Sequence, residues 1–195
     1  MSRTSEISRT TNETSVELRL DLDGSGAGER ASGVGFFDHL MDAVARHGGL
    51  DLDLRVRGDL ETGPHHTVED SGLALGAALD EALGDRAGIR RFGHAVVPMD
   101  DARASCAIDV SGRPFTLFEA DFPAERVSDL DTDLAEEWVR AVANTAKLTV
   151  HVRVEAGRNA HHMVEAAFKA FARALRVAIE LDPRETGVPS TKGLL

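Results

Sequence analysis

The sequence predicts an α/β (α+β sandwich) fold in which two internally duplicated lobes of sheet and helix pack as one compact unit. Segments that alternate apolar and polar residues predict strands, and segments with apolar residues at helical spacing lie between them. The same succession of elements occurs twice along the chain. With 195 residues, 42% of them hydrophobic, the chain is long enough to bury a single core without disulfides. We therefore expect one domain, residues 1–195, made of lobes at about 1–92 and 93–195.

Four segments have the period-two alternation of a strand with one face toward solvent. They are residues 16–22, 50–56, 104–110 and 148–154. In the first, Val16, Leu18 and Leu20 alternate with charged residues, and a glycine-rich stretch after Leu22 predicts a turn.

Four further segments predict helices. They are residues 37–46, residues 65–83 with Gly84 as the C-cap, residues 134–146, and a helix from near His161 to Ile179. The last is the clearest, because Val164, Phe168 and Phe171 begin an apolar face with a period of 3.6 residues.

An internal repeat relates the two halves of the chain. Residues 43–56 align without gaps on residues 141–154, a shift of 98 positions, and both segments are followed by an HHxxE motif. The motifs begin at His65 and His161, so the second shift is 96. Two copies of one motif in the same context indicate a duplicated lobe.

The duplicated motif predicts metal binding. On a helix, residues i and i+4 share a face, so His65 with Glu69, and His161 with Glu165, can each bind one cation. The neighbouring histidines, His66 and His162, point elsewhere and would reach a second metal or another chain. Imidazole and carboxylate ligands suit Mn, Fe, Zn or Ni and do not choose among them. Without the duplication, each motif would be a solvated helix start.

Two further residues extend this set. His39 begins a predicted helix in the same lobe as the first HHxxE motif and would add a third imidazole. Its repeat mate under the 98-residue shift is Glu137. The alternative is that His39 lies on the surface and that Glu137 is favoured only by the dipole of its helix.

Composition excludes several classes of function. The net charge is −11, which argues against broad nucleic-acid binding but allows a small anionic substrate. No apolar run is long enough to span a membrane, and the polar N-terminus lacks a signal-peptide core. The single cysteine, Cys106, fits a reducing environment, so we expect a cytoplasmic protein.

Several motifs together resemble the imidazoleglycerol-phosphate dehydratase family of histidine biosynthesis. They are FFDH, GD…HHTVED, FG…VPMD, SGRP, GRNAHHMVE and the C-terminal PSTKG, and the resemblance extends from Arg9 to Lys192. It implies lobes like ribosomal protein S5 domain 2, a homo-oligomer of 24 subunits, and two Mn(II) ions per active site at subunit contacts. The implied lyase reaction removes water from imidazoleglycerol phosphate to give imidazoleacetol phosphate.

The resemblance also assigns residues. It implies one metal bound by His39, His66, His161 and Glu165, and another bound by His65, Glu69, His162 and Glu137. Glu13 is implied as the acid/base group, beside the metal-bound Glu69 and Glu165. The implied contacts to substrate and phosphate are Glu13, His47, Arg91, Arg113, Lys169, Ser190 and Lys192. Such metals would hold the substrate ring as an imidazolate, which expels the hydroxyl through a diazafulvene-like intermediate.

The chain departs from the family pattern at four places. Glu137 replaces the usual histidine, Ala43 a glutamine, Asp101 a glutamate and Gly63–Pro64 an acidic pair. These departures leave two alternatives: a non-catalytic or altered-substrate paralogue that keeps structural metals at subunit contacts, and a metal-dependent hydrolase. The first predicts assembly without turnover. The second is disfavoured because the whole implied phosphate set is present.

Overall fold

The computed structural model describes residues 2–195, which form two four-stranded sheets and four long helices. The first sheet has the strand order β1 (Thr4–Thr10), β2 (Thr14–Asp21), β4 (Asp51–Gly58) and β3 (Arg30–Ala31). The second has the order β5 (Phe92–Met99), β6 (Ala102–Asp109), β10 (Thr149–Ala156) and β7 (Phe115–Glu119). A short hairpin of β8 (Arg126–Val127) and β9 (Leu130–Asp131) stands apart from both.

The two sheets have the same topology. In each, three strands are antiparallel neighbours and a fourth pairs in parallel at the edge, β3 beside β4 and β7 beside β10. The strands and helices of the first half therefore correspond in order to those of the second. This confirms the predicted α/β class with duplicated sheet–helix lobes.

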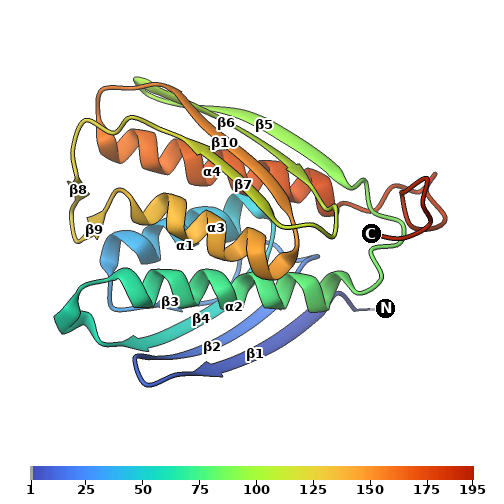
Figure 1. Ribbon diagram of the computed structural model, residues 1–195, viewed down its shortest axis with the longest axis horizontal. Coiled ribbons are helices and arrows are strands. Elements are labelled where there is room, and N and C mark those ends of the chain that lie inside the picture. The colour runs from blue at the N-terminus through green and yellow to red at the C-terminus, as the bar shows by residue number, and fades with distance from the viewer. Residues whose placement is uncertain (1) are drawn as a thin grey trace.

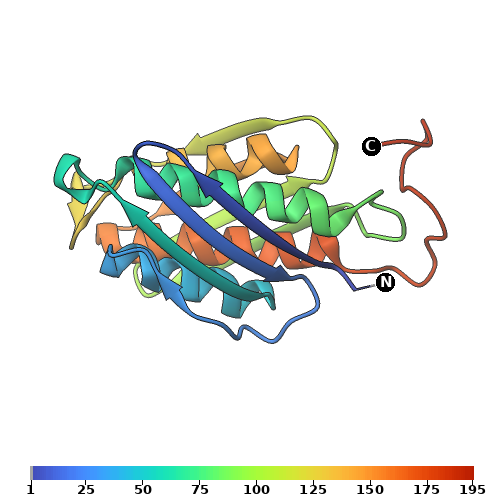
Figure 2. The ribbon, with the colours of Figure 1, turned by 90° about the horizontal axis from the view of Figure 1, so that it is seen from below.

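The helices are α1 (Gly35–Gly48), α2 (His65–Leu83), α3 (Leu134–Ala146) and α4 (Ala160–Ile179), with a 3₁₀ turn η1 (Leu60–Thr62) before α2. They lie between the two sheets and all begin at the same end of the molecule (Figure 1). Figure 2 shows the first sheet covering this helical layer from below. The closest helix pairs cross between lobes, α1 with α4 and α2 with α3.

A single apolar core joins the four helices. Trp138 of α3 is fully buried, with its ring centroid 4.9 Å from Phe168 and 5.3 Å from Phe171 of α4. The approach of α2 to α3 depends on Gly76, since a Cβ there would lie 2.0 Å from Thr145 Oγ1. Only glycine allows the two helices to pack this closely.

The predicted helices agree well with the observed ones. The bounds of α2 and α3 are those predicted, α4 begins at Ala160, and α1 is longer than predicted by two residues at each end. The four predicted strands correspond to β2, β4, β6 and β10. Strands β1, β5 and β7 were not predicted; β1 is rich in polar residues, and β5 contains Gly93 and Pro98, which weaken a strand pattern.

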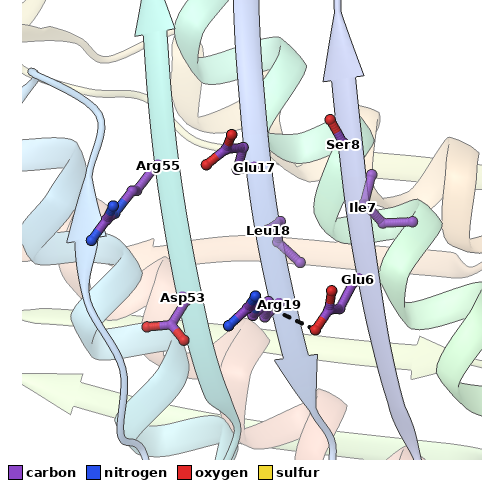
Figure 3. A pocket seen from close by; sticks show the side chains of 8 residues that line it. All are labelled: Glu6, Ile7, Ser8, Glu17, Leu18, Arg19, Asp53 and Arg55. Carbon is purple, nitrogen blue, oxygen red and sulfur yellow. Dashed lines mark ion pairs between the residues drawn. The ribbon is translucent and has the colours of Figure 1, made fainter.

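The outer faces of the two sheets differ. A hollow of about 580 Å³ on the first sheet is lined mainly by charged and polar side chains, and Arg19 pairs there with Glu6 at 3.2 Å (Figure 3). The second sheet instead exposes apolar side chains, including Phe92, Val96 and Phe115. Neither face contains a predicted metal ligand. In the described part of the chain, no helix combines the length and the apolar character needed to cross a bilayer.

Candidate metal centre

Three predicted ligands meet where α1 and α4 begin. Donor atoms of His39 on α1, and of His161 and Glu165 on α4, all lie within 4.8 Å of one another. Oε2 of Glu165 is 3.4 Å from His39 Nε2 and 3.2 Å from His161 Nε2. Among residues 2–195, these three form the one group in which three such donor atoms come this close. We call this group the triad.

Helix packing and capping hold the triad in place. The ring of Phe36 lies 4.7 Å from that of His161, which fixes the start of α1 against that of α4. The Asn159 side chain accepts a hydrogen bond from the backbone N–H of His161 at 3.0 Å and caps α4. At α1, the Asp129 carboxylate accepts the N–H groups of Gly35 and Phe36 at 2.6 and 3.0 Å. Asp129 thus reaches across from the turn between β8 and β9.

Glu165 is a buried carboxylate that stays ionised. Its burial alone would raise its pKa, but hydrogen bonds from Lys169 and His39 outweigh that effect, so the pKa lies below its usual value. Lys169 Nζ is 2.7 Å from Oε1, while Oε2 faces the two histidines. The triad therefore presents two imidazoles and one anionic oxygen, and the predicted phosphate ligand Lys169 lies beside it.

The first HHxxE motif provides a looser pair. His65 Nε2 and Glu69 Oε2 are 3.8 Å apart, and both side chains are about half exposed. Glu137, the repeat mate of His39, lies on the neighbouring helix α3, where its carboxylate pairs with Arg140 at 2.8 Å. Since α3 and α2 repeat α1 and α4, these three side chains occupy the positions that correspond to the triad.

His66 and His162 are directed away from their neighbours in the motifs, as predicted. Each ring is nearly perpendicular to that of the preceding histidine, at 87° and 86°. His66 Nδ1 contacts Asp59 at 3.1 Å, and this hydrogen bond raises the pKa of His66. His162 Nδ1 contacts Asp101 at 2.6 Å, and the hydrogen bond to His162 helps lower the pKa of Asp101 to about 2. Neither histidine belongs to the triad.

On the Nε2 side, both of these histidines face a second carboxylate. Glu13 Oε2 lies 3.9 Å from His66 Nε2, and Asp100 Oδ2 lies 3.6 Å from His162 Nε2. Glu13 belongs to the turn between β1 and β2, and Asp100 to the equivalent turn between β5 and β6. The structure thus places the predicted acid/base group beside a predicted metal ligand. The roles of Asp59, Asp100 and Asp129 were not predicted, because each contact joins segments that no local pattern relates.

The other predicted phosphate ligands lie near the opposite end of the helices. The Arg91 backbone N–H donates to the carbonyl of Ala178 near the end of α4, 13 residues beyond Glu165. At about 1.5 Å per residue, this separates the Arg91 backbone from the triad by about 20 Å. The Arg91 guanidinium is bidentate to Asp109 at 2.7 and 3.1 Å, which raises its pKa, and it donates to the carbonyl of Pro189.

The remaining predicted contacts to substrate and phosphate also lie toward the ends of the helices, away from the triad. Arg113 donates to the Ser111 carbonyl at 3.3 Å, and residue 110 in turn bonds Arg91 through the backbone. Ser190 accepts the backbone N–H of Lys192 in the tail that Arg91 holds through Pro189. His47 lies at the end of α1, and its burial, together with the charges of Lys169 and Arg173, lowers its pKa. One chain therefore does not bring the whole predicted set together.

Comparisons with known proteins identify the family of this chain. Residues 32–175 match the family model described as imidazoleglycerol-phosphate dehydratase. The chain is 54% identical over 194 residues to the imidazoleglycerol-phosphate dehydratase of Gluconacetobacter diazotrophicus, covering 99% of this chain and 98% of that one. It is 53% identical to that of Moorella thermoacetica, with full coverage of both chains.

Solved structures show the same fold. The crystal structure of the dehydratase from Staphylococcus aureus superposes with a TM-score of 0.84 at 36% identity, covering 92% of this chain and 99% of that one. The enzyme from Pyrococcus furiosus, in complex with (S)-C348, gives a TM-score of 0.85 at 35% identity and covers 97% and 100%. This chain therefore belongs to the imidazoleglycerol-phosphate dehydratase family and is a hydro-lyase.

Proposed function

We propose that this chain converts imidazoleglycerol phosphate to imidazoleacetol phosphate, with two Mn(II) ions per active site. The observation that carries the proposal is the triad of His39, His161 and Glu165, which gathers ligands from two lobes at one point. We further propose that residues 1–195 form one domain whose lobes meet near residue 92, and that the protein is cytoplasmic.

The donor set of the triad fits a divalent transition metal. Two imidazole nitrogens and one carboxylate oxygen suit Mn(II), and three ligands leave coordination positions open for others. His66 of a second copy of the chain would be the fourth ligand. His65, Glu69 and Glu137 would bind the second ion, with His162 from a neighbour. Glutamate oxygen is an acceptable Mn(II) ligand, so Glu137 can serve although its carboxylate also contacts Arg140.

The side chains around the metals account for the chemistry. Bound Mn(II) supplies the Lewis acidity that favours the imidazolate form of the substrate ring. From this form the side-chain hydroxyl would take a proton from an acid/base group and leave as water, and the resulting diazafulvene-like intermediate would make the neighbouring C–H acidic. Glu13 is about half exposed and 3.9 Å from His66 Nε2, so it can move a proton at the substrate side chain. Glu69 and Glu165 would bind the metals through their carboxylate oxygens.

The division of the site supports an assembly of many subunits. Lys169 lies at the triad, whereas Arg91, Arg113, Ser190 and Lys192 belong to the other end of the molecule. Imidazoleglycerol phosphate is too short to reach from the triad to residues about 20 Å away, so these phosphate contacts would come from another copy of the chain. A homo-oligomer of 24 subunits with metals at the subunit contacts satisfies this requirement.

Turnover by metal-stripped protein, as Mn(II) is titrated back, tests the proposal. We expect activity to return with about two equivalents of Mn(II) per chain. His161→Ala should lose both activity and bound metal, whereas His151→Ala, a histidine on the outer face of the second sheet, should retain both. Assembly that depends on metal but shows no turnover would instead favour the non-catalytic paralogue.

Complementation tests whether one active site draws on more than one chain. His161→Ala removes a triad ligand, and Arg113→Ala removes a residue at the opposite end, so each variant alone should be inactive. Co-expressed chains should assemble into mixed oligomers in which some sites combine the two intact ends. Recovered activity supports shared sites. Mixed oligomers that form but stay inactive would mean that each site lies within one chain.

A further inference from the structure

We propose that Asp59 and Asp101 are positioning residues that hold His66 and His162 in the tautomer with a hydrogen on Nδ1, which leaves Nε2 as the metal-binding atom. The inference rests on the proposed function, because it concerns how this chain presents two of the ligands to metals. It extends that function by assigning a role to two carboxylates that the proposed function does not use.

The geometry of the two pairs is the same. Asp59 carboxylate oxygens lie 3.1 Å from His66 Nδ1, and an Asp101 oxygen lies 2.6 Å from His162 Nδ1. A carboxylate can only accept a hydrogen bond, so Nδ1 must carry the hydrogen. A neutral imidazole has one hydrogen on its two nitrogens, so Nε2 then offers a lone pair. Such carboxylate partners fix ring orientation and make the metal-binding nitrogen more basic.

Both carboxylates also accept hydrogen bonds from other donors. One oxygen of Asp101 accepts the backbone N–H groups of Arg158 and Asn159 at 2.6 and 3.1 Å, just before α4 begins. One oxygen of Asp59 accepts the hydroxyl of Thr62 at 3.1 Å in the turn before α2. Each histidine therefore bonds a carboxylate that has a further partner, and the two backbone donors fix Asp101 more firmly than the one hydroxyl fixes Asp59.

Duplication alone does not explain these two contacts. Asp59 follows β4, whereas Asp101 lies in the turn between β5 and β6, so they occupy different places in their lobes. Asp59 lies in the loop where the repeat shift changes from 98 to 96 residues, so its mate is Gly157 or Glu155. Gly157 has no side chain, and Glu155 pairs with Arg103 at 2.7 Å. The same contact to the same ring atom is thus made from two unrelated positions. This indicates that the contact has a function of its own.

The other histidine of each motif is arranged differently. His65 and His161 direct Nε2 at the glutamate four residues later, within the same helix. Their ring atoms are therefore placed by a residue that itself binds the metal in the proposed site. His66 and His162 point away from that glutamate and need another partner to fix their rings. Asp59 and Asp101 supply it.

Metal affinity of the assembled protein tests the inference without relying on activity. Free Mn(II) is measured by electron paramagnetic resonance as metal-stripped wild type, Asp59→Ala and Asp101→Ala are titrated. We expect each variant to bind about half of its metal about 10- to 100-fold more weakly, since one of two sites is affected. Asp101→Glu keeps a carboxylate and should restore most of the affinity. Asp131→Asn removes a partly exposed aspartate that pairs with Arg126 and serves as the matched control.

The outcomes separate this inference from the proposed function. Wild-type affinity in both alanine variants, with normal assembly by size-exclusion chromatography, would overturn the positioning role and leave the dehydratase proposal intact. Equal loss in Asp131→Asn would also overturn it, because the effect would then be general. Wild-type protein that binds no Mn(II) would overturn both proposals. If one variant fails to assemble, the other still decides the question, because the two contacts lie in different lobes.

Discussion

The buried carboxylate of Asp70 joins the first sheet to α2 immediately after the first HHxxE motif. Its side chain is 9% exposed and lies 2.6 Å from Arg9 Nη1 of β1. The hydroxyl of Thr14, at the start of β2, donates a second bond to it. The repeat mate of Asp70 is Ala166, so only the first lobe has this connection. We predict that Asp70→Ala destabilises the protein far more than an exposed ion pair would.

The expected magnitude follows from burial. A hydrogen bond to a charged group contributes about 1.5–3 kcal/mol, and removing one partner of a fully buried ion pair costs about 3–5 kcal/mol. Arg9 is 34% exposed, so water can replace part of its lost interaction. We therefore expect Asp70→Ala to lower the free energy of unfolding by about 2–4 kcal/mol.

Asp42→Ala is a matched control. Asp42 also lies on a helix and also contacts an arginine, Arg30, at 2.6 Å, but its side chain is 56% exposed. Arg30 itself is only 11% exposed, but without Asp42 it keeps the carbonyls of Ala27 and Leu52 as acceptors at 3.1 Å. Its removal should cost about 0–1 kcal/mol. Urea unfolding at one protein concentration, followed by the fluorescence of the single tryptophan, Trp138, measures both. Equal losses in the two variants would refute the argument that burial sets the strength of these pairs.

Three further predictions concern stability. Asp129→Ala removes the acceptor for the first N–H groups of α1 and should cost about 0.5–2 kcal/mol in thermal unfolding. The backbone N–H groups of residues 25–27 lower the pKa of Asp51 below 3.8, so its stabilisation is present above about pH 4 and lost as the pH falls through the lowered value. Asp51→Asn should therefore unfold more easily than wild type in urea at pH 6 and approach wild type near pH 3. Gly76→Ala should force α2 from α3 and cost about 1–3 kcal/mol, measured by urea unfolding.

Each of these has a contradicting result. An unchanged melting temperature in Asp129→Ala would mean that water caps α1 equally well. A constant difference between wild type and Asp51→Asn from pH 6 to pH 3 would exclude the charge as its cause. Wild-type stability in Gly76→Ala would show that the two helices separate without cost. Ala78→Gly, at a neighbouring buried position of α2, measures the effect of exchanging alanine and glycine where α3 is not crowded. Comparing the two variants therefore separates steric crowding from helix propensity.

The sequence predicted the elements that have a buried and an exposed face. Strands such as β2 and β4 alternate strictly, because one side packs on helices and the other faces solvent. The edge strands were not predicted because an edge strand is stabilised mainly by hydrogen bonds to one neighbouring strand. Its own residues then need not alternate between apolar and polar. In β1, for example, Ser5 is buried and bonds the Ala78 carbonyl of α2 rather than packing as an apolar residue.

The geometry of the site could be predicted only where the spacing within one motif determines it. Spacing along one helix places His161 beside Glu165, and His39 was selected as a histidine at the start of a predicted helix. Contacts such as Asp101 to His162 join residues 61 positions apart, so they depend on how the β5–β6 turn meets α4. Spacing also cannot show that Arg91 lies at the far end of α4 from the triad, since that follows from the direction of the helix.

The crossed pairing of helices has a consequence for the origin of the chain. Each sheet covers one face of a helix from its own half, α2 in the first and α4 in the second, but the opposite faces of these helices are covered by α3 and α1 of the other half. A single ancestral lobe would have exposed these faces, and two identical lobes would have covered them for each other. The present chain has the architecture of a homodimer whose two subunits became one polypeptide through tandem gene duplication. Once fused, the halves could diverge independently, and the outer sheet faces differ accordingly: the first is mainly charged and polar, whereas the second also exposes large apolar side chains.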